Sequence, residues 1–155
     1  MVTERTTPMG LWHHAKEFYE AASVVLNAAG AKVSLPSYYL LGHSIELSLK
    51  AFLAARGVPI AELKSRKYGH DLKALLTEAR RRKLGLEVKL SAVDVGVIEL
   101  LNFDYVAKRF EYRETGVYHL PLINLADDVT GKLVKGLKKY CEANLQHALS
   151  GRADR

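Results

Sequence analysis

An arginine and a histidine lie close together in the stretch RFEYRETGVYHLP, residues 109 to 121. Arg113 and His119 have five residues between them and could together cleave RNA without a metal ion. In such a reaction the histidine moves the proton of the attacking 2′-hydroxyl or of the leaving oxygen, and the arginine neutralises charge on the phosphate. A chain of this composition contains about one such pair by chance, so the spacing alone does not establish a catalytic site.

The same stretch has a second interpretation, as a turn that joins two helices. Asp104, Glu111 and Glu114 are close enough in sequence to hold Arg113 in a salt bridge. If one of them does so, Arg113 is a structural residue and the segment has no catalytic role. The sequence leaves both interpretations open.

A second polar group lies in the segment LGHSIELSLK. His43, Glu46 and Lys50 are spaced three and four residues apart, so a helix places them on one face. Because buried charges need partners, they form either a polar cluster in a cleft or a Glu46–Lys50 ion pair at the edge of the fold. His43 and Glu46 have no third ligand at helical spacing, so we predict no metal site.

Two further reactive side chains have simpler explanations. His70, in YGHDL, precedes a predicted helix, where we expect it to cap or orient the turn. Cys141 has no histidine near it in sequence, and we expect it to pack in the interior. The sequence contains no Gly-rich phosphate loop and no G-x-S-x-G motif, so we predict no cofactor.

The net positive charge is concentrated in one segment. Residues 64 to 83 hold eight basic and two acidic residues, and the rest of the chain is neutral. Such a segment either binds a polyanion such as RNA or forms a solvated helix surface. The candidate binding residues are Lys64, Arg66, Lys67, Arg80, Arg81, Arg82 and Lys83.

Helical periodicity accounts for nearly all of the chain. Apolar residues recur every three or four positions over about 7–30, 36–57, 71–83 and 91–108, and from about 121 to a tail expected to fray at 150–155. SAVD at 91–94 resembles a capping box, and Gly131 and Gly136 in the last helix predict close packing against a neighbour. No useful segment alternates with period two. The sequence therefore predicts an all-α, up-and-down bundle of about five helices.

Length and composition indicate a single globular domain. The chain has 155 residues, of which 48% are hydrophobic and 26% charged, and this length can bury one core. No apolar run reaches the roughly 20 residues of a membrane span, and the first residues lack the pattern of a secretory signal. The single cysteine excludes an internal disulfide. We therefore expect a cytoplasmic protein that does not bind a membrane.

Three segments resemble the HEPN (higher eukaryotes and prokaryotes nucleotide-binding) superfamily over roughly residues 10 to 148: LGHSIELSLKAFLAARGVP, KYGHDLKALLTEA, and YRETGVYHLP before a long final helix. The resemblance implies an up-and-down bundle, commonly a homodimer, in which the helix with His43 and Glu46 is central. In many members an Arg-x(4–6)-His motif forms a metal-independent endoribonuclease site, with two copies meeting across the dimer. Such members occur in toxin–antitoxin and phage-defence systems, often beside a nucleotidyltransferase partner.

Arg113 and His119 match that motif by position. Glu114 follows the arginine where active members usually carry a small polar residue, and His119 precedes Pro121, before the last helix. Many members lack the motif and act as binding or assembly modules. We therefore predict a module that binds a nucleotide, RNA or protein partner without catalysis, with the endoribonuclease as the alternative. The apolar surface of the second and last helices predicts a homodimer.

Overall fold

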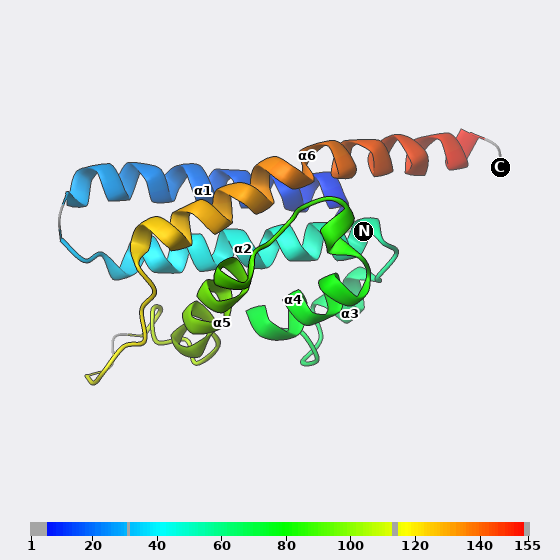
Figure 1. The fold of residues 1–155 in the computed structure, drawn as a ribbon. Helices are drawn as coiled ribbons and strands as arrows, with labels where there is room; N and C mark the ends of the chain where they lie inside the picture. Colours follow the sequence, from blue (N-terminus) through cyan, green and yellow to red (C-terminus); the bar gives the residue numbers. More distant parts are fainter. Residues whose placement is uncertain (1–5, 31, 113–114, 154–155) are drawn as a thin grey trace, which may run out of the picture.

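The fold is known from a computed structural model that describes residues 6–30, 32–112 and 115–153, with side chains up to residue 144. These residues form six α-helices, one 3₁₀ turn and no β-strand, as Figure 1 shows, so the predicted all-α bundle is confirmed. The helices are α1 (Pro8–Ala29), α2 (Leu35–Ala55), α3 (Ile60–Leu63), α4 (Leu72–Arg81), α5 (Ala92–Val106) and α6 (Ile123–Ala153), with η1 (Leu84–Leu86) after α4. None of these helices combines the length and apolarity needed to cross a membrane.

α2 lies at the centre of the bundle. It contacts α1 and α6 on one side and α4 and α5 on the other, as Figure 1 shows. Leu41, Ile45 and Leu49 of this helix are completely buried. The surrounding helices therefore explain why α2 is apolar around most of its circumference.

The starts of the long helices follow the capping residues in the sequence. The Thr7 hydroxyl accepts a backbone N–H at the start of α1, and Ser91 and Asp94 form the predicted capping box of α5. Asp71 caps α4 and lies one residue before that helix rather than inside its first turn. Each capping side chain binds a backbone N–H that the helix leaves without a partner.

α4 and α5 each end about two residues before the predicted position. Lys83 (φ 68°) and Lys108 (φ 59°) adopt the left-handed backbone conformation, which a right-handed helix cannot contain. Two short elements, α3 and η1, were not predicted. With four and three residues they are too short to show a helical period.

α6 packs closely against its neighbours at two glycines. A Cβ atom at Gly131 would lie 2.8 Å from the Tyr19 hydroxyl, and one at Gly136 would lie 2.7 Å from a methyl group of Val88. The predicted close packing is therefore confirmed. The helix continues as far as Ala153, and residues 154 and 155 lie outside the described part of the chain.

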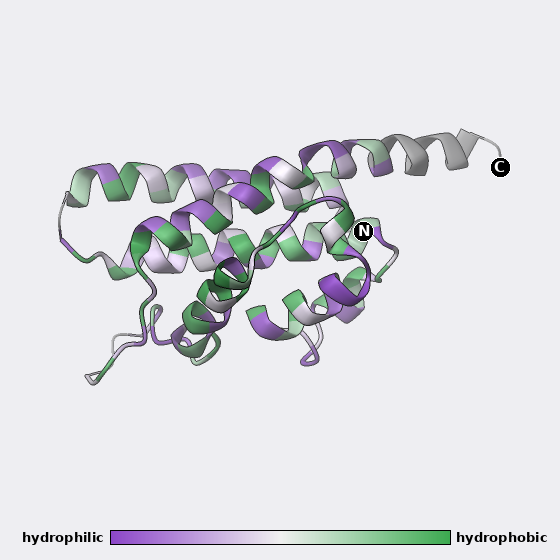
Figure 2. Cartoon of the chain, in the orientation of Figure 1, coloured by the Kyte–Doolittle hydropathy of each residue, from purple (hydrophilic) through white to green (hydrophobic). Residues whose placement is uncertain are grey.

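Among the residues with described side chains, α5 carries four exposed large apolar residues and α2 and α6 carry none, so that part of the sequence argument was wrong. Val93, Leu100, Phe103 and Val106 are 61, 41, 57 and 43% exposed, and we call them the α5 surface. Their spacing places them on the side of α5 that faces away from the core. Figure 2 shows hydrophobic residues around much of this helix. The prediction failed because neighbouring helices enclose α2 and the apolar side of α6.

Candidate functional site

Asp104, near the end of α5, holds the segment that follows this helix. Its carboxylate is buried, with Oδ1 accepting a hydrogen bond from Nη1 of Arg109 and Oδ2 accepting one from the backbone N–H of His119, both at 2.6 Å. Arg109 also donates to the carbonyl of Val117 at 2.7 Å, and its guanidinium lies 4.3 Å from the ring centre of Tyr118. One buried carboxylate therefore closes the turn at both ends.

The side chain of His119 is exposed on this turn. The centre of its ring lies 4.1 Å from that of Phe103, a member of the α5 surface. Among the described residues, neither ring nitrogen has a hydrogen-bond partner. Arg113 and Glu114 lie outside the described residues, so the pairing of Arg113 with His119 stays a prediction.

A buried carboxylate on α2 joins three elements. Glu46 is 2% exposed, and its Oε2 accepts a hydrogen bond from Nζ of Lys50 at 3.0 Å. Its Oε1 accepts from the Tyr105 hydroxyl at 2.7 Å and from Nδ1 of His70 at 2.8 Å. Nδ1 of His43 lies 3.1 Å from the same hydroxyl. The structure thus brings the predicted His43, Glu46 and Lys50 together and adds His70 and Tyr105; we call these five residues the Glu46 cluster.

The hydrogen bonds of the Glu46 cluster assign a proton to Nδ1 of both histidines. An ionised carboxylate only accepts, so His70 donates its Nδ1–H and Tyr105 donates its O–H to Glu46. The oxygen of Tyr105 then accepts the Nδ1–H of His43. The side chain of His70 is 47% exposed, and its Nε2 is the ring nitrogen that remains for a hydrogen bond to a ligand or to solvent.

Burial and hydrogen bonding shift the ionisation of this cluster. Burial opposes the charge of Glu46, but the Lys50 ammonium and the hydrogen bonds from Tyr105, His70 and Lys50 outweigh it, and the pKa of Glu46 lies below its ordinary value. Burial lowers the pKa of His43, partly offset by the charge of Glu46. Near neutral pH the cluster therefore contains an ionised Glu46 and a neutral His43.

Three polar residues in the last half of α5 are buried, and each binds a different part of the chain. Asn102 accepts the backbone N–H of Leu72 at 2.8 Å and donates to the Asp71 carboxylate at 3.0 Å, which fixes the start of α4. Asp104 fixes the turn after α5, and Tyr105 binds the carboxylate on α2. Because all of these contacts connect elements of the fold, we assign the Glu46 cluster a structural role.

Several of the predicted polyanion-binding residues are paired with acids. Arg81 and Arg82 both bind Glu78, at 2.5 and 2.7 Å, and Lys67 lies 3.3 Å from Glu62. The hydrogen bonds from Arg81 and Arg82 lower the pKa of Glu78 to about 2. Acidic neighbours therefore reduce the charge that this segment offers to a polyanion.

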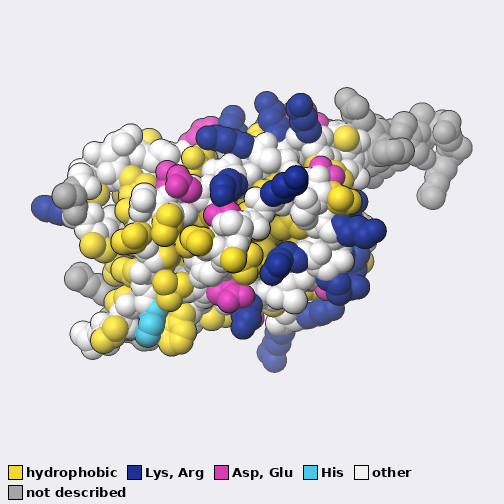
Figure 3. Space-filling model, in the orientation of Figure 1, with side chains coloured by type: hydrophobic (Ala, Val, Ile, Leu, Met, Phe, Trp, Pro, Cys, Tyr) yellow, Lys and Arg dark blue, Asp and Glu magenta, His cyan; other side chains and the backbone are white. Residues whose placement is uncertain are grey.

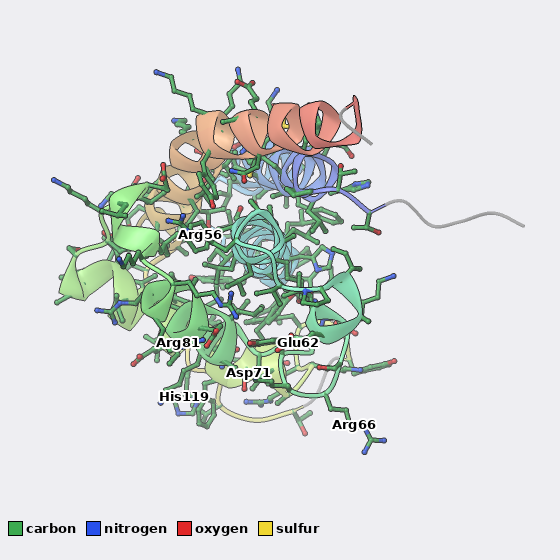
Figure 4. The ribbon with its side chains drawn as sticks, turned by 90° about the vertical axis from the view of Figure 1, so that its right-hand side faces the viewer. Arg56, Glu62, Arg66, Asp71, Arg81 and His119 are labelled. Carbon is green, nitrogen blue, oxygen red and sulfur yellow. The ribbon has the colours of Figure 1, made fainter. Side chains whose placement is uncertain are left out.

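The seven residues also do not form one compact patch. Figure 4 shows Arg66 pointing into solvent, well away from Arg81. The turn with Lys64, Arg66 and Lys67 precedes α4, whereas residues 80–83 lie at its other end. The first eight residues of α4, 72–79, lie between the two groups.

Neither Cys141 nor a metal centre adds a further site. Cys141 is completely buried, and burial raises the pKa of its thiol to about 12. The predicted interior packing of this side chain is confirmed. Within the described ranges, no three His, Cys, Asp or Glu side chains lie close enough together to hold a metal ion.

Sequence reasoning missed three residues that organise the site, Asn102, Tyr105 and Arg109. It considered Asp104 only as a partner of Arg113 and missed its contacts with Arg109 and His119. A signal was present, because Asn102, Asp104 and Tyr105 occupy positions that continue the buried side of α5 from Ile98. Polar residues at core positions need partners, so they mark a buried network. Periodicity does not identify those partners, which lie as far as 59 residues away in sequence.

No family model matches the chain, and neither the curated proteins nor the solved structures searched show significant similarity to it. The function therefore has to be argued from the geometry of the molecule itself.

Proposed function

We propose that the chain is a HEPN-like helical module that forms a homodimer through its α5 surface and binds a nucleotide, RNA or protein partner without catalysis. The observation that carries the proposal is the row of exposed apolar side chains on α5. Contiguous exposed apolar residues of this kind typically mark an interaction surface. Burying their exposed parts contributes roughly 4 kcal/mol per chain, which suits a moderately stable dimer.

Charge complementarity favours a second copy of the chain as the occupant of this surface. Glu99 and Lys108 are exposed on either side of Phe103, and neither has an ionic partner among the described residues. In an antiparallel pair of α5 helices centred near Phe103, Glu99 faces Lys108 of the partner subunit. A two-fold dimer repeats that contact on both sides of its axis. Gly96 has no atom within 4 Å of an added Cβ, which leaves room for close approach.

Light scattering over a range of concentrations tests the proposed dimer. At micromolar concentration we expect a mass twice the 17.3 kDa of one chain. Hydrogen exchange at α5 should slow as the concentration rises, because the surface becomes covered. A mass that stays at one chain at every concentration would contradict the proposal.

The alternative is a metal-independent endoribonuclease that uses Arg113 and His119. One observation favours it: the His119 imidazole is exposed, lies against the proposed dimer surface and has both ring nitrogens without a described partner. Its backbone is meanwhile held by Asp104, so the turn can present the ring in a defined position.

RNA cleavage in the presence of a chelator separates the two functions. An endoribonuclease of this kind leaves a 2′,3′-cyclic phosphate, and His119→Ala should abolish cleavage. His13→Ala, at an exposed histidine on α1, is the control and should keep full activity. Intact RNA across pH 6 to 8 with wild-type protein would support the module without catalysis.

A further inference from the structure

A second group of cations lies on α6, away from the turn before α4. Lys135, Lys138 and Lys139 are exposed on α6, and none has an ion pair within 4 Å among the described residues. We call these three residues the α6 ridge. Figure 3 shows Lys and Arg side chains spread over the upper and right-hand parts of this face. The α6 ridge lies outside residues 64–83, where the sequence places the charge.

Two further cations lie across a closely packed junction from the α6 ridge. Arg80 and Lys89 line one hollow of about 290 Å³ beside η1, together with Val88. Val88 in turn packs against Gly136, in the middle of the α6 ridge. The last turn of α4 and the connection that follows it therefore bring Arg80 and Lys89 to the side of α6, although Lys135 lies 46 positions after Lys89 in the sequence.

We propose that the α6 ridge, with Lys89 and Arg80, is the surface on which the protein binds a nucleic-acid strand through its phosphates. Cations without acidic partners, repeated along a rigid helix, match the repeated charge of a phosphodiester backbone. Lys135 and Lys139 are one turn apart, about 6 Å along the axis, which is within reach of neighbouring phosphates for side chains of this length. The inference rests on the proposed binding function and names its partner and its surface.

The surroundings of the α6 ridge favour a nucleic acid over a membrane surface. A helix that lies on a membrane exposes apolar residues beside its cations. In the part of α6 with described side chains, the apolar side is instead buried: Val129, Leu133 and Leu137 are 0% exposed. Glu87 and Glu142 are the nearest acidic residues in sequence to Lys89 and Lys139, and neither is paired with the five cations. The charge of Lys135 acts on Asp127, and Asp128 lines one hollow with Lys135. The excess of positive charge therefore lies at Lys138, Lys139, Lys89 and Arg80.

Two matched triple variants test the assignment of the surface. Lys135→Gln, Lys138→Gln and Lys139→Gln together remove three charges from the α6 ridge. Lys64→Gln, Arg66→Gln and Lys67→Gln remove the same number from the turn before α4 and serve as the control. The probe is a labelled single-stranded RNA of mixed sequence about 20 nucleotides long, which exceeds the site size of one small domain. Its Kd is measured by fluorescence anisotropy at several salt concentrations.

We expect the α6 variant to raise the Kd at low salt by at least about tenfold. The slope of log Kd against log salt should also fall by about 2, because each phosphate contact with a single strand contributes about 0.7 to that slope. The control variant should change the Kd less than about threefold. An equal or larger loss in the control variant would overturn the surface assignment but leave the proposed function standing. Absence of RNA binding by the wild type at low salt would overturn the inference, but would leave the proposed dimer with a nucleotide or protein partner standing. Tighter binding to anionic phosphatidylserine vesicles than to RNA would contradict the choice of partner.

Discussion

The imidazole of His119 lies against the ring of Phe103, with ring centres 4.1 Å apart. Beside Phe103, the carboxylate of Asp104 accepts the backbone N–H of the same histidine at 2.6 Å. Two consecutive residues of α5 therefore position His119, one through its side chain and one through its backbone. His119, one of the two candidate catalytic residues, therefore lies at the edge of the α5 surface.

Loss of the Glu46 carboxylate should destabilise the fold strongly. In Glu46→Gln, the amide NH₂ group that replaces Oε2 can neither balance the charge of Lys50 nor accept its hydrogen bond. We therefore expect a loss of about 2–4 kcal/mol in the free energy of unfolding. Glu20→Gln on α1 is the matched control, because Glu20 forms the same i, i+4 pair with Lys16 at an exposed position. The control should cost less than about 1 kcal/mol. Equal losses of unfolding free energy for Glu46→Gln and Glu20→Gln, measured by urea denaturation, would show that the buried Glu46 stabilises the fold no more than an exposed glutamate.

A methyl group at Gly42 should disturb the same region by steric overlap. A Cβ there would lie 2.6 Å from the ring of Tyr105, so Gly42→Ala should destabilise by about 1–3 kcal/mol despite the higher helix propensity of alanine. Gly96→Ala on α5 has open space and should stabilise by about 0.5–1 kcal/mol. Both are measured by urea denaturation at low protein concentration, where the proposed dimer contributes little. A stabilising effect of Gly42→Ala would contradict the close contact.

Stability should fall as the pH falls below neutral. The pKa of His43 is below its usual 6.5 in the folded chain, so the unfolded chain binds a proton first and is stabilised relative to the folded chain as the pH drops through about 6.5. The pKa of Glu46 is also lowered, so its contribution is present above about pH 4.5 and is lost as the pH falls through the folded value.

Urea midpoints measured between about pH 4 and pH 8 test this dependence. His43→Gln should remove the part of the decline that lies just below pH 6.5, and Glu46→Gln should flatten the part below about pH 4.5. A urea midpoint that rises as the solution is acidified would contradict the lowered pKa values of His43 and Glu46.

The thiol of Cys141 should be unreactive until the protein unfolds. With a pKa of about 12 and no exposed surface, the folded side chain has almost no accessible thiolate at pH 8. Its reaction with a disulfide reagent should therefore follow the unfolding equilibrium as urea is added. Rapid labelling of the folded protein, at the rate seen in denaturant, would contradict the burial of this residue.

The helices could be predicted from the sequence because their signals are local. Thr7, Ser91 and Asp94 cap helices through side chains close to the backbone groups that they bind, and the buried stripes repeat at helical spacing. The Glu46 cluster was predicted in part for the same reason, since His43, Glu46 and Lys50 share one helix face.

The rest of the site depends on contacts between distant segments. His70 reaches Glu46 across 24 residues, and Tyr105 reaches it across 59, so no local pattern identifies them as partners. The apolar surface was assigned to the wrong helices for a related reason. An apolar helix such as α2 needs an enclosing surface, but only the packing shows whether its own chain or a second copy provides it.

Sedimentation equilibrium of three proteins tests the proposed α5 dimer most directly: the wild type, Phe103→Asp, and Val24→Asp as the control. Val24 is 69% exposed on α1, outside the α5 surface, so its variant adds the same charge at an unrelated exposed apolar residue. We predict a dimer for the wild type and for Val24→Asp, and for Phe103→Asp a Kd at least about 30-fold weaker, as for a central interface residue. A monomeric wild type at tens of micromolar, or equal weakening by both substitutions, would contradict the α5 dimer.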